Sequence, residues 1–244
     1  MAPVRISKRS FSLPVGNGEA VPSVFQIPEG AATVPGVLLL HGFTSRKERV
    51  AESIGRSLAV RGVASLAIDL PMHGARQGRS ESLSLRNPLA LVQAWKLAVR
   101  EANQAIEYLA AHEAIDPGRL AIAGYSIGAY LAMVVAADNP RVRAIALVAG
   151  GDLPEQTPFL SFVRGVADPR RAARSLAGRP LLMVNGKRDR TVTPAQARAL
   201  FAAASEPKEL RWYDGGHWPP ETAIDDVALW LADQLSNRTK RRLA

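Results

Sequence analysis

The sequence predicts an α/β protein built on a mostly parallel, eight-stranded sheet with helices on both faces. Eight short apolar runs occur along the chain, and helical stretches separate the later ones. Strands that alternate with helices indicate a parallel sheet covered on both sides. Several runs are continuously apolar rather than alternating, which is typical of strands buried on both faces. No repeat or break in composition divides the 244 residues, so we expect one domain over residues 1–244.

The first two runs, Phe11–Leu13 and Val21–Gln26, are joined by the segment PVGNGEA and predict a hairpin at the sheet edge. The six later strands are expected at Val37–Leu40, Val63–Ile68, Leu120–Ala123, Val142–Val148, Leu181–Val184 and Leu210–Tyr213. Helices are expected over Glu48–Val60, Pro88–Ala111, Ser126–Ala137, Pro194–Ala204 and Pro220–Leu235. Asn87 and Pro88 have the residue types of an N-cap and a first helical turn.

The least regular interior segment is Gly150–Pro180. It is longer than most connections between elements, and loops of that length are often functional. We interpret it as a short, cap-like insertion around residues 150–180. Its apolar side chains Phe159, Leu160 and Phe162 could lie over a site or simply cover the top of the core.

Composition excludes several classes of function. The net charge is +9, but part of the excess lies at the two ends and the rest is scattered without interleaved aromatic residues. We therefore expect no nucleic-acid partner. The chain has no cysteine, which excludes disulfides, thiolate metal sites and a cysteine nucleophile. We expect no cofactor, no metal and no membrane partner, and a cytoplasmic monomer or homodimer because no export signal is recognisable.

Ser126 lies in the segment Gly124-Tyr-Ser-Ile-Gly128, between a predicted strand and a predicted helix. This pattern is typical of a strained turn that raises a serine hydroxyl above the carboxyl end of a parallel sheet. The glycines allow strand and helix to approach closely. The same glycines could serve only a tight turn, but the position favours a nucleophilic serine.

A serine hydroxyl needs a base, and the chain has four histidines. His41, His73 and His217 follow strands at the correct end of the sheet, whereas His112 lies at the opposite end. His217 is preferred because the base comes last in the chain order of serine, acid and histidine.

Asp189 follows the strand Leu181–Val184 and is the preferred acid to orient His217. Asp152 is the second candidate, and Asp214 is too near His217 on the same turn. Asp189 could also serve only to cap the turn before a helix. The backbone N–H groups of Ile127 and Phe43 are the candidate oxyanion donors.

Five segments, LLLHGFTSRKE, AIDLPMHGAR, GYSIGA, NGKRDRTVTP and GGHWP, make the chain resemble the α/β-hydrolase superfamily over nearly its whole length. It is most similar to small single-domain bacterial serine esterases related to dienelactone hydrolases and cinnamoyl esterases. The resemblance implies the α/β-hydrolase fold with a minimal cap. It also implies a triad of Ser126, Asp189 and His217, with Phe43 and Ile127 as oxyanion donors.

The resemblance further implies that Asp69 and His73 belong to a structural turn. The chain departs from the family pattern in three ways. Dienelactone hydrolases proper use a cysteine, Met72 stands where many relatives carry glycine, and the cap insertion is short compared with cinnamoyl esterases.

These features predict a serine carboxylesterase that cleaves small-molecule esters of short acyl chains through an acyl-enzyme. Phe159, Phe162 and Trp218 are the candidate substrate-binding residues. A thioesterase, a lactonase or a peptidase with the same triad remains an alternative, as does a non-catalytic binding protein that keeps the fold.

Overall fold

A computed structural model describes residues 4–15, 20–30, 33–76, 88–155, 160–176 and 178–236 of the chain. Two residues named above, Asn87 and Phe159, lie outside these ranges. Leu160 and Phe162 lie within a described helix, but their side chains are not described.

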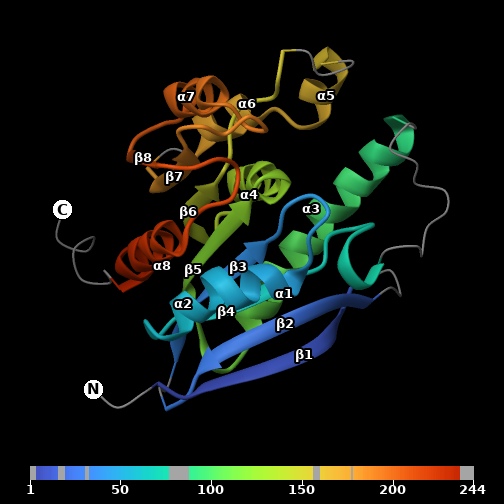
Figure 1. The fold of residues 1–244 in the computed structure, drawn as a ribbon. Coiled ribbons are helices and arrows are strands. Elements are labelled where there is room, and N and C mark those ends of the chain that lie inside the picture. Colours follow the sequence, from blue (N-terminus) through green and yellow to red (C-terminus); the bar gives the residue numbers. More distant parts are fainter. Residues whose placement is uncertain are drawn as a thin grey trace.

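The predicted eight-stranded sheet is confirmed, in the order β1-β2-β4-β3-β5-β6-β7-β8 (Figure 1). The strands are β1 (Ile6–Pro14), β2 (Ala20–Pro28), β3 (Val34–Leu40), β4 (Ala64–Ile68), β5 (Ile115–Tyr125), β6 (Val142–Val148), β7 (Leu181–Gly186) and β8 (Lys208–Tyr213). β1 pairs antiparallel with β2, and β2 pairs antiparallel with β4. The remaining pairs are parallel, so β3 to β8 all end at the same edge of the sheet.

Helices cover both faces of this sheet. The helical elements are α1 (Lys47–Val50), the π-helical η1 (Ala51–Gly55), α2 (Arg56–Ala59), the 3-10 turn η2 (Gly74–Arg76), α3 (Pro88–Ala111), α4 (Ile127–Asp138), α5 (Leu160–Val166), α6 (Pro169–Ser175), α7 (Pro194–Ala203) and α8 (Glu221–Ser236). The predicted helix Glu48–Val60 is therefore one continuous helical stretch with a π-helical middle. Gly150–Pro180, expected to be irregular, contains the two seven-residue helices α5 and α6.

The core has two layers because successive strand residues point to opposite faces of the sheet. In β3, Leu38 and Leu40 pack with residues of α3, α4, α6 and α7, whereas Val37 and Leu39 pack with residues of α1, η1, α2 and α8. Both faces of the strand are thus buried, which explains its uninterrupted apolar run.

Candidate active site

Ser126 connects the end of β5 to the start of α4. Its backbone lies in the left-handed region, with φ 55° and ψ −117°. A residue with a side chain pays about 1–3 kcal/mol for such a conformation, so the surrounding structure must hold it there. One restraint is the hydrogen bond from the Ser126 N–H to the Val148 carbonyl, at 2.9 Å. The turn is therefore strained and tied to the neighbouring strand β6.

The glycines on either side of Ser126 are required by close packing. A Cβ on Gly124 would collide with the backbone of Gly128, and a Cβ on Gly128 would collide with the carbonyl oxygens of Leu40 and His41. The start of α4 thus lies directly against the ends of β5 and β3. Any side chain at either glycine would push the helix and its serine away from the sheet.

His217 follows β8 and reaches both of its expected partners. Its Nε2 lies 3.0 Å from the Ser126 Oγ, and its Nδ1 lies 2.8 Å from the Asp189 Oδ2. A carboxylate can only accept hydrogen bonds, so Nδ1 carries the proton and Nε2 is left as the acceptor for the serine hydroxyl. This is the tautomer that a general base needs.

Asp189 is buried just beyond the end of β7, and both of its carboxylate oxygens are engaged. Oδ1 accepts hydrogen bonds from the N–H groups of Thr191 and Val192, at 2.8 and 3.0 Å. Oδ2 accepts the bond from His217. The two interpretations of Asp189, cap of a turn and partner of the histidine, therefore hold at once, because each uses a different oxygen.

The other acid candidates do not contact His217 through their side chains in the structure. Asp152 is buried, and its Oδ2 pairs with Arg164 at 2.9 Å and with Arg170 at 2.6 Å. These arginines belong to α5 and α6, so Asp152 anchors the two helices of the insertion. Asp214 is exposed and pairs with Arg188 at 2.5 Å.

The remaining histidines have other partners. His73 bonds the Pro71 carbonyl through Nδ1, at 2.7 Å. The His112 ring lies 4.9 Å from the Phe25 ring at the opposite end of the sheet. His41 is fully buried: its Nδ1–H donates to the Gly42 carbonyl, and its Nε2 accepts from the Leu70 N–H.

The two candidate oxyanion donors come from the start of α4 and from the loop after β3. Ile127 is the first residue of α4, where backbone N–H groups have no acceptor within the helix. Phe43 follows Gly42, whose backbone passes close to the serine: a Cβ added there would lie 2.7 Å from the Tyr125 ring and 3.3 Å from the Ser126 Cβ. The Phe43 side chain is exposed, and its ring packs edge-on against His73.

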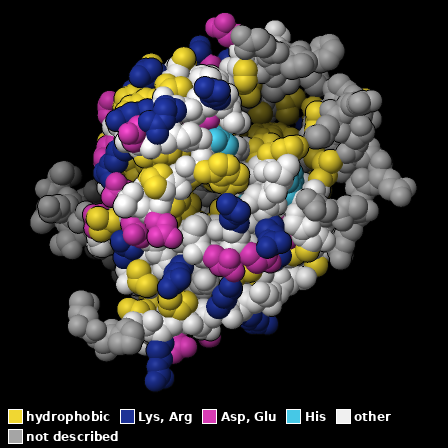
Figure 2. All heavy atoms as spheres, viewed as in Figure 1, with side chains coloured by type: hydrophobic (Ala, Val, Ile, Leu, Met, Phe, Trp, Pro, Cys, Tyr) yellow, Lys and Arg dark blue, Asp and Glu magenta, His cyan; other side chains and the backbone are white. Residues whose placement is uncertain are grey.

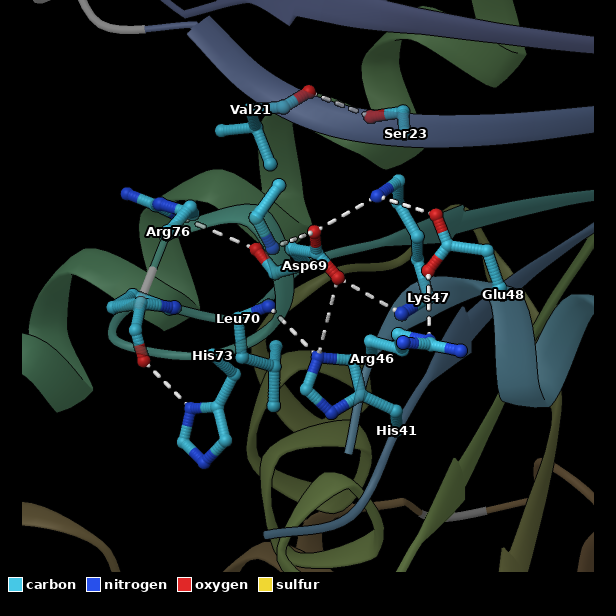
Figure 3. A network of polar contacts seen from close by, with 12 residues as sticks. Val21, Ser23, His41, Arg46, Lys47, Glu48, Asp69, Leu70, His73 and Arg76 are labelled. Atoms are coloured by element: carbon cyan, nitrogen blue, oxygen red, sulfur yellow. Dashed lines mark hydrogen bonds and ion pairs between the residues drawn. The ribbon is translucent and has the colours of Figure 1, made fainter. Parts of the chain in front are cut away.

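The loop that carries Phe43 is held by the buried carboxylate of Asp69 (Figure 3). Asp69 accepts hydrogen bonds from the backbone N–H and the Nζ of Lys47, at 2.8 and 2.9 Å, and from the Ala75 N–H at 2.9 Å. Burial lowers the pKa of Lys47, but its bonds to Glu48 and Asp69 outweigh burial and the net shift is upward. Lys47 thus remains charged, and its pair with Asp69 ties the loop after β3 to the loop after β4.

Acid is expected to destabilise the protein through His41. Burial lowers the pKa of His41 from 6.5 to about 4 in the folded protein. Between these values the unfolded chain binds a proton that the folded protein does not, so the free energy of unfolding falls as the pH falls. We expect this one group to remove about 2 kcal/mol between pH 7 and pH 4.5.

Urea denaturation of the wild type and of His41→Gln at several pH values measures this contribution. The variant loses stability at pH 7 if its amide cannot replace both imidazole hydrogen bonds, but it should lack this part of the pH dependence. Equal dependence on pH in the two proteins would contradict the role given to His41.

Two aromatic side chains, Tyr125 and Trp218, pack beside His217. The exposed Trp218 ring stacks on the Tyr125 ring at 5.3 Å, and the Arg49 guanidinium lies 4.7 Å from the centre of the Trp218 ring. Tyr125 and Trp218 also line an open groove of about 1470 Å³ that runs along α1, η1, α2 and the start of α8. Ser126 and His217 do not line this groove. Figure 2 shows cationic and anionic side chains interspersed over this face, without a patch of one sign.

Tyr125 and Tyr213 are site residues that sequence reasoning missed. Their hydroxyls donate to backbone carbonyls in the segment that carries His217. Both tyrosines are the last residues of parallel strands, and this position is the signal that could have identified them. Gly186 was missed as well: a Cβ there would collide with the Gly216 carbonyl, so this glycine allows the His217 segment to approach β7.

Met72 occupies a left-handed conformation, with φ 68°, of the kind that glycine adopts freely. This is the position where the sequence departs from the glycine of many relatives.

Within the described ranges, no three His, Asp or Glu side chains gather to form a metal site. None of the helices in the described part of the chain is long and apolar enough to cross a membrane.

Comparison with known proteins gives an independent result. Residues 21–217 match the model of the dienelactone hydrolase family. The chain is 28% identical over 115 residues to the polyketide transferase ATR5 of Stachybotrys chlorohalonatus. The aligned region covers 47% of this chain and 36% of that protein. It is 27% identical over 210 residues to the esterase YjfP of Escherichia coli, covering 76% of this chain and 82% of YjfP.

A solved structure resembles the whole fold. It is the PEG-bound complex of a cold-adapted esterase from an Arctic intertidal metagenomic library, with a TM-score of 0.73, 25% identity and 94% of each chain covered. These matches confirm the resemblance to dienelactone-hydrolase-like esterases and the fold class that the sequence predicted.

Proposed function

Because this chain belongs to the dienelactone hydrolase family, we propose that it is a serine esterase that uses Ser126, His217 and Asp189 as its catalytic triad. One observation carries the proposal. His217, which follows β8, bonds the Ser126 hydroxyl and the Asp189 carboxylate at the same time, at 3.0 and 2.8 Å. The three groups come from loops at one edge of the sheet, where parallel α/β proteins bind their ligands.

In the proposed reaction, the Ser126 Oγ attacks the carbonyl carbon of an ester while His217 Nε2 takes the hydroxyl proton. The negative charge that develops on the carbonyl oxygen is stabilised by the N–H groups of Ile127 and Phe43. Asp189 holds the protonated imidazole. The imidazolium then gives its proton to the leaving alcohol, and an acyl-enzyme remains on Ser126.

Water then hydrolyses the acyl-enzyme by the same proton transfers, with water in place of the alcohol. His217 takes a proton from the water molecule as its oxygen attacks the acyl carbon, and then returns that proton to Ser126 as the acid leaves. No metal or cofactor is needed for either half of the reaction. Trp218 stands next to His217 in the sequence, and we propose that it forms part of the wall on the substrate's side.

Labelling with a fluorophosphonate probe tests the nucleophile directly. The purified protein should react at Ser126, and the modified peptide should be identified by mass spectrometry. Rates on matched ester, thioester, lactone and anilide substrates then separate an esterase from the alternatives with the same triad. A folded protein that neither labels nor turns over any of these substrates would refute the proposal and favour a binding protein.

We expect kcat/KM on p-nitrophenyl esters to peak at short acyl chains, of about two to six carbons, and then to fall. Each further buried methylene is worth about 0.8 kcal/mol, but only where there is apolar surface to bury it against. Here the insertion provides two helices of seven residues each. A rate that keeps rising to the palmitate ester, or activation at a lipid interface, would show that the insertion forms a substantial acyl-binding lid.

A further inference from the structure

The segment that carries His217 has no regular secondary structure. It runs from Asp214 to Pro220, between β8 and α8, and contains two glycines directly before the histidine. Glycine allows many backbone conformations, so local preference does not hold this segment in one shape. The imidazole must nevertheless stay within hydrogen-bond distance of two groups on other loops. The segment therefore depends on contacts from the rest of the molecule.

Two tyrosine hydroxyls provide such contacts. The Tyr213 hydroxyl lies 2.9 Å from the Gly216 carbonyl oxygen and 3.3 Å from the His217 carbonyl oxygen. The Tyr125 hydroxyl lies 3.1 Å from the same His217 carbonyl oxygen. The histidine backbone is thus held by one donor from β8 and one from β5, the strand that ends at Ser126.

The Tyr125 ring contributes as well as the two hydroxyls. The Tyr125 ring lies 5.2 Å from the His217 imidazole and also stacks on the Trp218 ring. Burial, the largest cause, raises the pKa of both tyrosines, so their hydroxyls stay protonated and remain donors at ordinary pH. Both side chains are 7% exposed, which leaves little room for water to replace them.

We propose that Tyr125 and Tyr213 are positioning residues that hold the backbone of His217, so that its imidazole bridges Asp189 and Ser126. Neither hydroxyl bonds a side chain of the triad. They act through the backbone of the general base. The expected effect on kcat therefore rests on the proposed function. The effect on the hydrogen bond between His217 and Asp189 does not depend on that function and can be measured separately.

The loss of the Tyr213 hydroxyl is expected to lower kcat more than the loss of the Tyr125 hydroxyl. The single hydroxyl proton of Tyr213 is shared between two carbonyls, with the shorter contact to Gly216, and Tyr125 donates to the other one, that of His217. Replacing Tyr125 by phenylalanine leaves the His217 carbonyl with Tyr213, whereas replacing Tyr213 removes the donor from the Gly216 carbonyl as well. A misplacement of about 1 Å in a catalytic group can cost about 100-fold in rate. We therefore expect Tyr213→Phe to lower kcat about 10-fold, and the double variant about 100-fold, with KM within about twofold.

The chain offers a matched control in Tyr130. Its hydroxyl also donates to a backbone carbonyl, that of Asp152 at 3.2 Å, and its pKa is likewise raised by burial. It lies on α4, about one turn after Ser126, and its hydroxyl bonds outside the His217 segment. Tyr130→Phe therefore removes the same kind of bond from the same neighbourhood, and kcat should change by less than about twofold.

The experiment measures kcat and KM for the wild type, Tyr125→Phe, Tyr213→Phe, the double variant and Tyr130→Phe, per active site titrated with a fluorophosphonate. The proton shared by His217 Nδ1 and Asp189 is followed in parallel as a far-downfield signal in proton NMR. The proposal expects kcat to fall at nearly constant KM, and this signal to broaden or vanish in the double variant but persist in Tyr130→Phe. Thermal unfolding of each variant shows whether the fold is retained.

A double variant that keeps both the wild-type kcat and the wild-type signal overturns the proposal. A kcat loss of equal size in Tyr130→Phe also overturns it, because the effect would then follow from any lost buried hydrogen bond. A wild type that hydrolyses no ester refutes the proposed function instead. In that case the NMR signal alone tests the positioning: its loss in the double variant but not in the control supports it, and its persistence in both overturns it.

Discussion

Ser126→Ala is expected to lower kcat for ester hydrolysis by about 10⁵–10⁶-fold and to leave the fold intact. The alanine removes the oxygen that, in the proposed reaction, bonds the acyl group, while the strained turn keeps its glycine neighbours and its hydrogen bond to Val148. His217→Ala should have an effect of similar size. The double variant should be little worse than either single one, because members of a triad act as a unit.

Steady-state kinetics on a short p-nitrophenyl ester measures the loss, and thermal unfolding provides the control for structure. A Ser126→Ala protein that retains more than about one per cent of the wild-type kcat would place the nucleophile elsewhere. Separate losses that multiply in the double variant would show that the two residues act independently, contrary to a triad.

Asp189→Asn is expected to lower kcat by about 10⁴-fold, for a reason specific to this geometry. The N–H groups of Thr191 and Val192 hold one side-chain oxygen of residue 189 in place. An asparagine oxygen would remain with those two donors, so its NH₂ group would face His217. A donor at this position favours the tautomer with the proton on Nε2, which cannot accept the proton of Ser126.

Asp152→Asn is the matched control. Asp152 is as deeply buried as Asp189 and also follows a parallel strand, but its carboxylate pairs with Arg164 and Arg170. This variant should be less stable, because Arg170 and Arg164 lose this carboxylate as a partner, although Arg164 keeps its pair with Asp168. The kcat of the folded protein should change by less than about threefold. If Asp152→Asn were the more damaging of the two in kcat, Asp189 would not be the acid.

Local sequence patterns predicted most of the helices and strands. Where a prediction was wrong, the reason lies in the local sequence. The run Val142–Val148 coincides with β6, whereas the predicted Leu120–Ala123 is only the inner part of β5. The outer part of β5 includes Pro117 and Gly118, which weaken a strand pattern. The helices α5 and α6 were missed because seven residues are too few to show helical periodicity. Asp168, which caps α6 by accepting from the N–H groups of Arg170 and Arg171, was a readable signal.

The sequence by itself determined the eight strands, to within a few residues at most of their ends, and the strand-to-helix turn at Ser126, and it predicted the chain order of serine, acid and histidine. These features depend on residues close together in the chain: apolar runs form buried strands, and the spacing of Gly124 and Gly128 suits a strand-to-helix turn. Two aspartates followed predicted strands, with Asp189 preferred over Asp152, and tyrosines at strand ends carried no catalytic pattern at all.

Only the tertiary structure decided which acid meets His217 and what holds the histidine in place. Asp189 follows β7, which pairs with β8, the strand before His217, whereas Asp152 follows β6, one strand further away. Strand order alone does not decide contact, because Ser126 follows β5, three strands from β8, and still lies 3.0 Å from His217. The side chains also matter: the Asp152 carboxylate pairs with Arg164 and Arg170, whereas the Asp189 carboxylate bonds His217. These contacts depend on the packing of the whole chain, so the sequence indicated Asp189 only as the preferred of two acids and carried no sign of the bonds from Tyr125 and Tyr213 to the His217 segment.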